Sequence, residues 1–86
     1  MQVIPDYLSA TEKAIMLMLR INPTRAHVAI ALGMTLKALK NKLFLITRKY
    51  NVKTLPEVMA QDEALLAQGI DMVQLNRHNN RKERYL

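Results

Sequence analysis

Signals that begin and end helices recur along this 86-residue chain and constrain its fold more than any other feature. Ser9 with Glu12 and Thr54 with Glu57 have the spacing of a capping box, in which each side chain satisfies a free backbone N–H group at a helix start. Two further breaks each combine a helix terminator with a new cap residue, Asn22-Pro23-Thr24 and Gly33-Met34-Thr35. The sequence therefore predicts four helices separated by short turns, and no strand pattern competes with them.

Apolar residues recur at helical spacing between these signals. Leu39, Leu43, Ile46 and Tyr50 would form one stripe about four turns long on the third helix. The other predicted inner faces comprise Ile15, Met16 and Leu19, then Val28, Ala29 and Leu32, and finally Leu55, Val58, Met59, Leu65 and Leu66. Because half of the residues are apolar, we expect a compact all-α domain with one core.

The sequence also predicts a C-terminal extension beyond the fourth helix, which should end at Gly69. Residues 70–76 are expected to form a short fifth helix, and the polar, basic segment 77–86 a mobile arm. We therefore divide the chain into a domain over residues 1–69 and an extension over residues 70–86.

Basic residues are concentrated in one part of the chain. Between residues 13 and 56 there are nine Lys or Arg side chains and no Asp or Glu, and the net charge is +6. A solvated charged face is the usual explanation for such a bias. A stretch of this length without any acid instead favours a polyanionic partner, nucleic acid first and an anionic membrane surface second. The separate, individually capped helices argue against a membrane binder.

Composition argues against several other classes of protein. The absence of cysteine excludes disulfides and thiolate metal sites and suits a reducing cytoplasm. The longest apolar run, residues 14–19, is far shorter than the roughly 20 residues that span a bilayer. No nucleophile–histidine–acid set, carboxylate pair or glycine-rich phosphate loop stands out, so we expect no catalysis and no cofactor. His27 and His78 are isolated, so we expect no metal.

Residues 24–50 have the features of a helix-turn-helix: two helices joined by a tight turn that contains glycine, the second of them long and basic. Ala29 is small where the helices must approach each other, and Gly33 lies in the turn. The outward positions of the second helix carry no acid; they are Lys37, Lys40, Asn41, Phe44 and Arg48. A purely structural helical hairpin would not usually leave this face free of acidic residues.

From Leu8 to Met59 the chain resembles the DNA-binding domain of LuxR/NarL/GerE-type regulators. The pattern L-[ST]-x-x-E is matched by LSATE (8–12), I-A-x-x-L-x-[IM]-[ST] by VAIALGMT (28–35), and I-x-x-K-[LMY]-x-V by ITRKYNV (46–52). The resemblance implies a compact four-helix helix-turn-helix domain. Its third helix, over about residues 35–50, would enter the major groove, and its fourth would often make a two-fold dimer contact.

The resemblance also implies which residues contact DNA. Lys40, Asn41 and Phe44 would face the bases, where they suit guanine, adenine and a thymine methyl group respectively. The implied phosphate contacts are Thr24, Arg25, Lys37, Lys42, Arg48 and Lys49. A solvated helix face remains the alternative for Lys40 and Asn41, and burial against a neighbour or partner the alternative for Phe44.

Some positions depart from the family pattern. Ala38 stands where the family usually has threonine, and Lys42 where it usually has histidine. Four apolar residues stand at commonly polar positions, Leu17, Ile30, Phe44 and Leu45. We expect that residues 70–75 fold back over some of them, or that they meet a second chain. The predicted dimer or partner interface comprises Val58, Met59, Leu65, Leu66, Leu17, Ile30 and Leu45.

The sequence thus predicts a bacterial, cytoplasmic and nucleoid-associated transcription regulator that binds specific double-stranded DNA sites as a homodimer. The alternative is a protein-interaction module that pairs with another regulator or with RNA polymerase and thereby modulates transcription.

Overall fold

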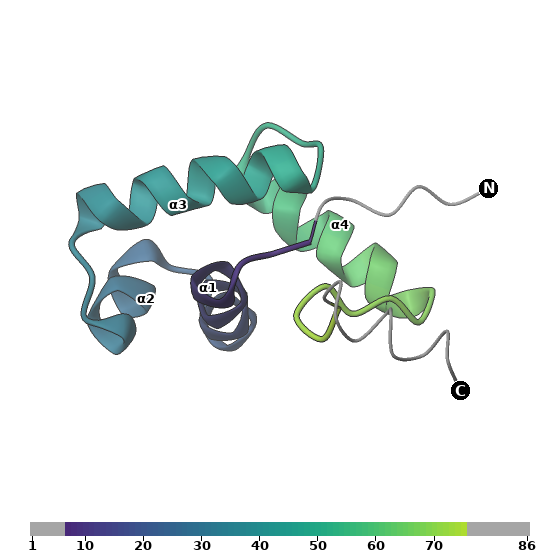
Figure 1. The fold of residues 1–86 in the computed structure, drawn as a ribbon, viewed down its shortest axis with the longest axis horizontal. Helices are drawn as coiled ribbons and strands as arrows, with labels where there is room; N and C mark the ends of the chain where they lie inside the picture. The colour runs from purple at the N-terminus through teal and green to yellow at the C-terminus, as the bar shows by residue number, and fades with distance from the viewer. Residues whose placement is uncertain (1–6, 76–86) are drawn as a thin grey trace.

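The computed structural model describes residues 7–75, which form four helices and no strand. Helix α1 spans Ala10–Ile21, α2 spans Arg25–Leu32, α3 spans Leu36–Lys49 and α4 spans Leu55–Ala67 (Figure 1). The predicted all-α class is confirmed. None of the helices in this range has the length and apolar character needed to cross a membrane.

Each helix begins where the sequence places a cap residue. The side chains of Ser9, Thr24, Thr35 and Thr54 each accept a hydrogen bond from the backbone N–H three residues further on. Both predicted capping boxes are complete. Gly33 ends α2 with a φ of 64°, a left-handed conformation that costs glycine little, and this allows the chain to turn at once into α3.

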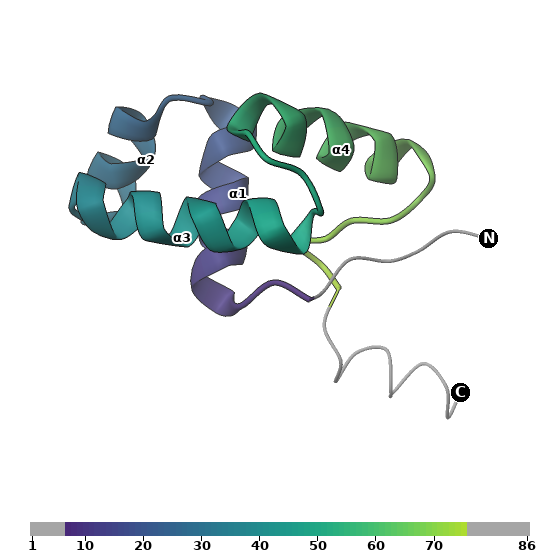
Figure 2. The same cartoon turned by 90° about the horizontal axis from the view of Figure 1, so that it is seen from above.

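Helix α3 lies along one side of the molecule and α1 crosses it at a steep angle, as the two perpendicular views show (Figures 1 and 2). Helix α2 lies beneath the N-terminal end of α3, and α4 leaves from the region of its C-terminal end. Within residues 7–75, no other helix covers the side of α3 that faces away from α1.

The core is built from one apolar stripe of each helix, as predicted. Leu39, Leu43, Ile46 and Tyr50 are all buried, and Leu39 and Ile46 are wholly inaccessible to solvent. They pack in one cluster with the buried residues of the other elements, Leu8, Ile15, Met16, Leu19, Val28, Ala29, Val58, Leu65, Met72 and Val73. Leu66, which the sequence placed on the inner face of α4, is exposed.

Residues 70–75 do not form the predicted fifth helix. They make a single turn, in which the backbone N–H groups of Gln74 and Leu75 donate to the carbonyl of Asp71. Met72 and Val73 enter the main core, so the segment packs with the helices and does not cover Leu17, Ile30, Phe44 or Leu45, which stay exposed. Position 76 and the predicted basic arm, 77–86, lie outside the described residues.

Candidate nucleic-acid interface

The exposed side of α3 carries five of the nine residues that the sequence assigned to DNA: Lys37, Lys40, Asn41, Phe44 and Arg48. Since successive residues of an α-helix are about 100° apart, Lys37, Asn41 and Arg48 project on one narrow stripe opposite the buried Leu39 and Ile46. Lys40 and Phe44 flank that stripe on one side, and Leu45 flanks it on the other. All six outward residues are exposed and none is acidic: Lys37, Lys40, Asn41, Phe44, Leu45 and Arg48.

Most of the basic side chains have no acidic partner. Within residues 7–75, the three ion pairs engage only Arg20 and Lys49 among the nine basic residues of the acid-free stretch. The others have no carboxylate of the described residues within 4 Å; they are Lys13, Arg25, Lys37, Lys40, Lys42, Arg48 and Lys53. These cations are therefore available to an external polyanion.

Phe44 is stabilised in an exposed position by its own helix. Its side chain is 59% exposed, and the Arg48 guanidinium lies over the ring, 5.7 Å from the centroid. A guanidinium at this distance is attracted by the negative face of the ring. The alternative that Phe44 is buried against a neighbouring residue is therefore not met among residues 7–75.

Thr24 and Arg25, the predicted phosphate contacts at the start of α2, are both exposed. The Thr24 hydroxyl accepts a hydrogen bond from the backbone N–H of His27, 3.4 Å away, and its own proton stays free to donate. Lys42, also predicted to contact phosphate, is half-buried and has no acidic partner among the described residues.

A hollow of about 310 Å³ opens beside α3. It is lined by residues of α2, of α3 and of the segment that leads into α4: Arg25, Lys40, Leu43, Phe44, Thr47, Lys53, Thr54, Leu55 and Pro56. The hollow joins two predicted base-facing residues to one predicted phosphate contact. Lys53 and Thr54 have no binding role predicted from the sequence, because only the packing of α4 against α3 brings them to this place.

Lys49 is not a free phosphate contact, which corrects that prediction. Its Nζ lies 2.6 Å from Oε1 of Glu12, a carboxylate that is almost completely buried. The same oxygen accepts a hydrogen bond from the backbone N–H of Ser9. Burial tends to raise the pKa of Glu12, but the hydrogen bonds from Lys49 and Ser9 outweigh it and hold the pKa below its ordinary value. Lys49 therefore neutralises a buried charge and fixes α3 on α1.

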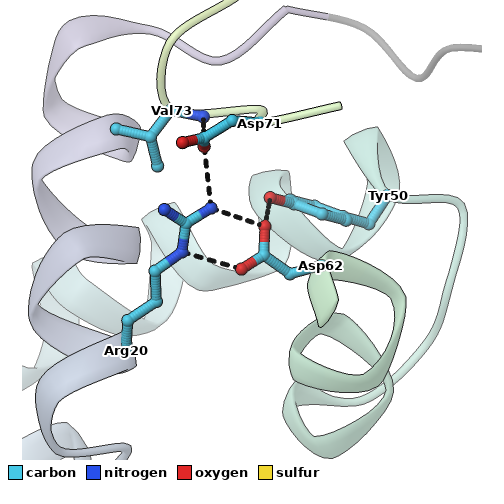
Figure 3. Close-up of polar contacts among 5 residues, drawn as sticks. All are labelled: Arg20, Tyr50, Asp62, Asp71 and Val73. Atoms are coloured by element: carbon cyan, nitrogen blue, oxygen red, sulfur yellow. Dashed lines mark hydrogen bonds and ion pairs between the residues drawn. The ribbon is translucent and has the colours of Figure 1, made fainter. Parts of the chain in front are cut away.

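A second polar cluster joins α1, α3, α4 and the C-terminal turn (Figure 3). The Arg20 guanidinium donates from Nε to Oδ2 of Asp62 at 2.8 Å, and from Nη2 to Oδ1 of Asp62 at 3.0 Å and to Oδ1 of Asp71 at 2.9 Å. The Tyr50 hydroxyl donates to Oδ1 of Asp62 at 2.9 Å and does not reach the surface. Burial and the Asp62 carboxylate raise the pKa of Tyr50 well above its ordinary value.

The predicted interface residues divide into three groups by their exposure. Val58 and Leu65 are wholly buried in the core, so they cannot contact a second chain without unfolding; this part of the prediction is corrected. Met59 is half-buried beside an apolar hollow of about 420 Å³ that Pro23, Leu55 and Pro56 also line. The remaining four are exposed: Leu17, Ile30, Leu45 and Leu66. Ile21 and Leu36, which the sequence analysis did not single out, are exposed as well.

Folding stability should decrease in acid, because two paired carboxylates titrate there. The Glu12 pKa is below its ordinary value for the reason given above; for Asp71, burial is outweighed by Arg20 and by the backbone N–H groups of Val73 and Gln74, which lower its pKa. A carboxylate with a lowered pKa in the folded state contributes stability above its unfolded pKa and loses it as pH falls towards the folded value. We expect the urea midpoint to fall steadily below about pH 4.5. An unchanged midpoint between pH 6 and pH 3 would contradict these pairings.

In comparisons with protein-family models, with curated proteins and with solved structures, the chain matches none of them.

Proposed function

We propose that this chain is a sequence-specific transcription regulator of the LuxR/NarL/GerE type that binds double-stranded DNA with α3 in the major groove. One observation carries the proposal: the exposed face of α3 presents basic and amide side chains with no acid among them, and α1 and α2 support the helix from behind. The connection between α2 and α3 supports the proposal, because a helix-turn-helix joins two helices by a short turn and exposes the second, and residues 33–35 join α2 to an exposed α3.

The dimensions and chemistry of α3 suit the major groove. A helix with its side chains is about 10–12 Å wide, and the groove is about 12 Å wide. Asn41 has the donor and acceptor needed for adenine, Lys40 can donate to guanine, and the Phe44 ring can contact a thymine methyl group. Thr24, Arg25, Lys37, Lys42 and Arg48 would bind phosphates around this face and fix its register.

Binding as a homodimer is part of the proposal. A single α3 reads only a few base pairs, and two copies related by a two-fold axis would read two half-sites about one helical turn apart. With Val58 and Leu65 committed to the core, the α4 residues left for such a contact are Met59 and Leu66.

Selection of bound duplexes from a random pool tests the function directly. We expect one enriched sequence with repeated half-sites, bound with a steep salt dependence of about 0.9 in log K per log unit of salt for each phosphate contacted. The mass of the protein should be measured in solution and on the selected duplex. A protein that binds no duplex above the level of nonspecific association would contradict the proposal.

Asn41→Ala should relax base preference at one position of the selected site. We expect the difference in binding free energy between the preferred and the other base pairs there to fall by about 1–3 kcal/mol, because the amide would otherwise pair with one base edge. Lys13→Ala, on α1, is the control and should leave every preference unchanged. Equal preferences in wild type and Asn41→Ala, measured by competition binding, would remove Asn41 from the reading residues.

The second candidate function is a protein-interaction module that pairs with another regulator or with RNA polymerase. The exposure of large apolar side chains favours it, above all Ile30, which is 82% exposed, and Phe44. Retained regulatory activity without duplex binding, abolished by Ile30→Asp, would support this candidate over the first.

A further inference from the structure

The hollow beside α3 brings together cations from three separate parts of the chain. Arg25 comes from the first position of α2, Lys40 from the middle of α3, and Lys53 from the segment between α3 and α4. All three are exposed, and none forms an ion pair within residues 7–75. Like charges gathered without an acid repel one another, so an anion bound among them would relieve that repulsion.

Among residues 7–75, no carboxylate belongs to the lining of the hollow. The acid closest in sequence, Glu57, is engaged at the start of α4, where it accepts hydrogen bonds from the backbone N–H and the hydroxyl of Thr54 at 3.1 Å and 2.8 Å. In addition, α2 begins at Arg25 and α4 at Leu55, so two helix N-termini with positive partial charge border the same space. The electrostatics of the hollow therefore favour an anion.

Most of the remaining lining is apolar. Leu43, Phe44, Leu55 and Pro56 supply carbon surface beside the cations, and the other two lining residues, Thr47 and Thr54, donate their hydroxyl protons to the Phe44 carbonyl and to Glu57. A small inorganic anion has no carbon atoms that could pack against such a surface. A sugar-phosphate unit of DNA presents both parts, an anionic phosphodiester and the carbon atoms of a deoxyribose ring, so it matches the hollow better.

We propose that this hollow seats one sugar-phosphate unit of the DNA backbone, with Arg25 and Lys53 binding the phosphate from two different elements. This inference rests on the proposed function and deepens it, because it assigns Lys53 to the interface and joins α2 and the start of α4 to the strand beside α3. Since every nucleotide carries the same phosphate, binding at this hollow adds affinity for DNA and fixes the register of α3 without adding base preference.

Substitution of the two cations tests the seat. Lys53→Gln and Arg25→Gln should each weaken binding to the selected duplex about eightfold per bound subunit in 0.1 M salt and lower the salt slope by about 0.9 per bound subunit, with base preference unchanged. Lys13→Gln removes a half-buried lysine of α1 that does not line the hollow, and it should leave both quantities unchanged. The substituted side chains have no partner within the described chain, so the thermal midpoint should not move.

Neutral methylphosphonate linkages, introduced one at a time into the selected duplex, locate the phosphate. One position should weaken binding by the wild type several-fold and have little effect on Lys53→Gln or Arg25→Gln. The proposed phosphate site would be contradicted if both variants kept the affinity and salt slope of the wild type. It would also be contradicted if a methylphosphonate linkage weakened binding equally in the wild type and the variants. Neither result would contradict DNA binding itself. If the wild type bound no duplex, both the proposed function and the proposed phosphate site in the hollow would be contradicted.

Discussion

Asp62→Ala is expected to lower the free energy of unfolding by about 3–5 kcal/mol, because it leaves buried polar groups without a partner. The Asp62 side chain is 3% exposed and binds both Arg20 and Tyr50. Its removal would leave the Tyr50 hydroxyl buried without its acceptor. Arg20 would keep only Asp71 as an ion-pair partner among the described residues. Because a domain of this size is stable by only about 5–15 kcal/mol, the variant should be largely unfolded at moderate urea concentrations.

Urea unfolding followed by circular dichroism measures this effect, with Glu63→Ala as the matched control. Glu63 is the next residue of α4 and is exposed, and its side chain has no hydrogen bond or ion pair with any residue of the range 7–75, so its loss should change stability by less than about 0.5 kcal/mol. Equal urea midpoints for the two variants would show that the Arg20, Tyr50 and Asp62 cluster does not hold α4 in place.

Lys49→Ala is expected to destabilise the fold by about 2–3 kcal/mol, somewhat less than the loss of a fully buried partner because the lysine is partly in water. The cause is the Glu12 carboxylate, which would remain buried with the backbone N–H and hydroxyl of Ser9 as its remaining donors among the described residues. Thermal or urea unfolding at pH 7 is the measurement.

The double variant Glu12→Gln with Lys49→Met separates this role from DNA contact. A neutral pair should recover part of the lost stability, since no charge is then left buried. At a temperature where both proteins are folded, the salt slope of DNA binding should match that of the wild type. A lower slope in the double variant would instead place Lys49 on a phosphate.

Helix boundaries were the part of the fold that the sequence predicted best. Caps act within three or four residues of the helix start, so Ser9, Thr24, Thr35 and Thr54 were recognisable without tertiary information. The stripe of α3 was equally clear, because apolar spacing is also local. The structure of residues 70–75 could not be predicted in this way, since Met72 and Val73 pack against helices far from them in sequence.

The candidate site was predictable in part for the same reason. The outward face of α3 follows from the period of one helix, so Lys37, Lys40, Asn41, Phe44 and Arg48 could be named from the sequence. Contacts between residues far apart in the sequence could not be predicted in this way. The ion pair that removes Lys49 from the phosphate contacts was not foreseen, because its partner, Glu12, lies 37 residues away. Lys53 was not assigned to the site, because nothing in the local sequence places it beside Arg25.

The sequence by itself determined the helices, their inner stripes and the concentration of basic residues, since each depends on residues within one or two turns. Only the tertiary structure decided which of those charges remain free. Arg20 and Lys49 are taken up by acids from outside the acid-free stretch, because burial makes an unpaired carboxylate costly and draws a cation to it. Among the described residues, the cations of α2, of α3 and of the segment before α4 that the fold leaves without a carboxylate are the ones that we assign to DNA.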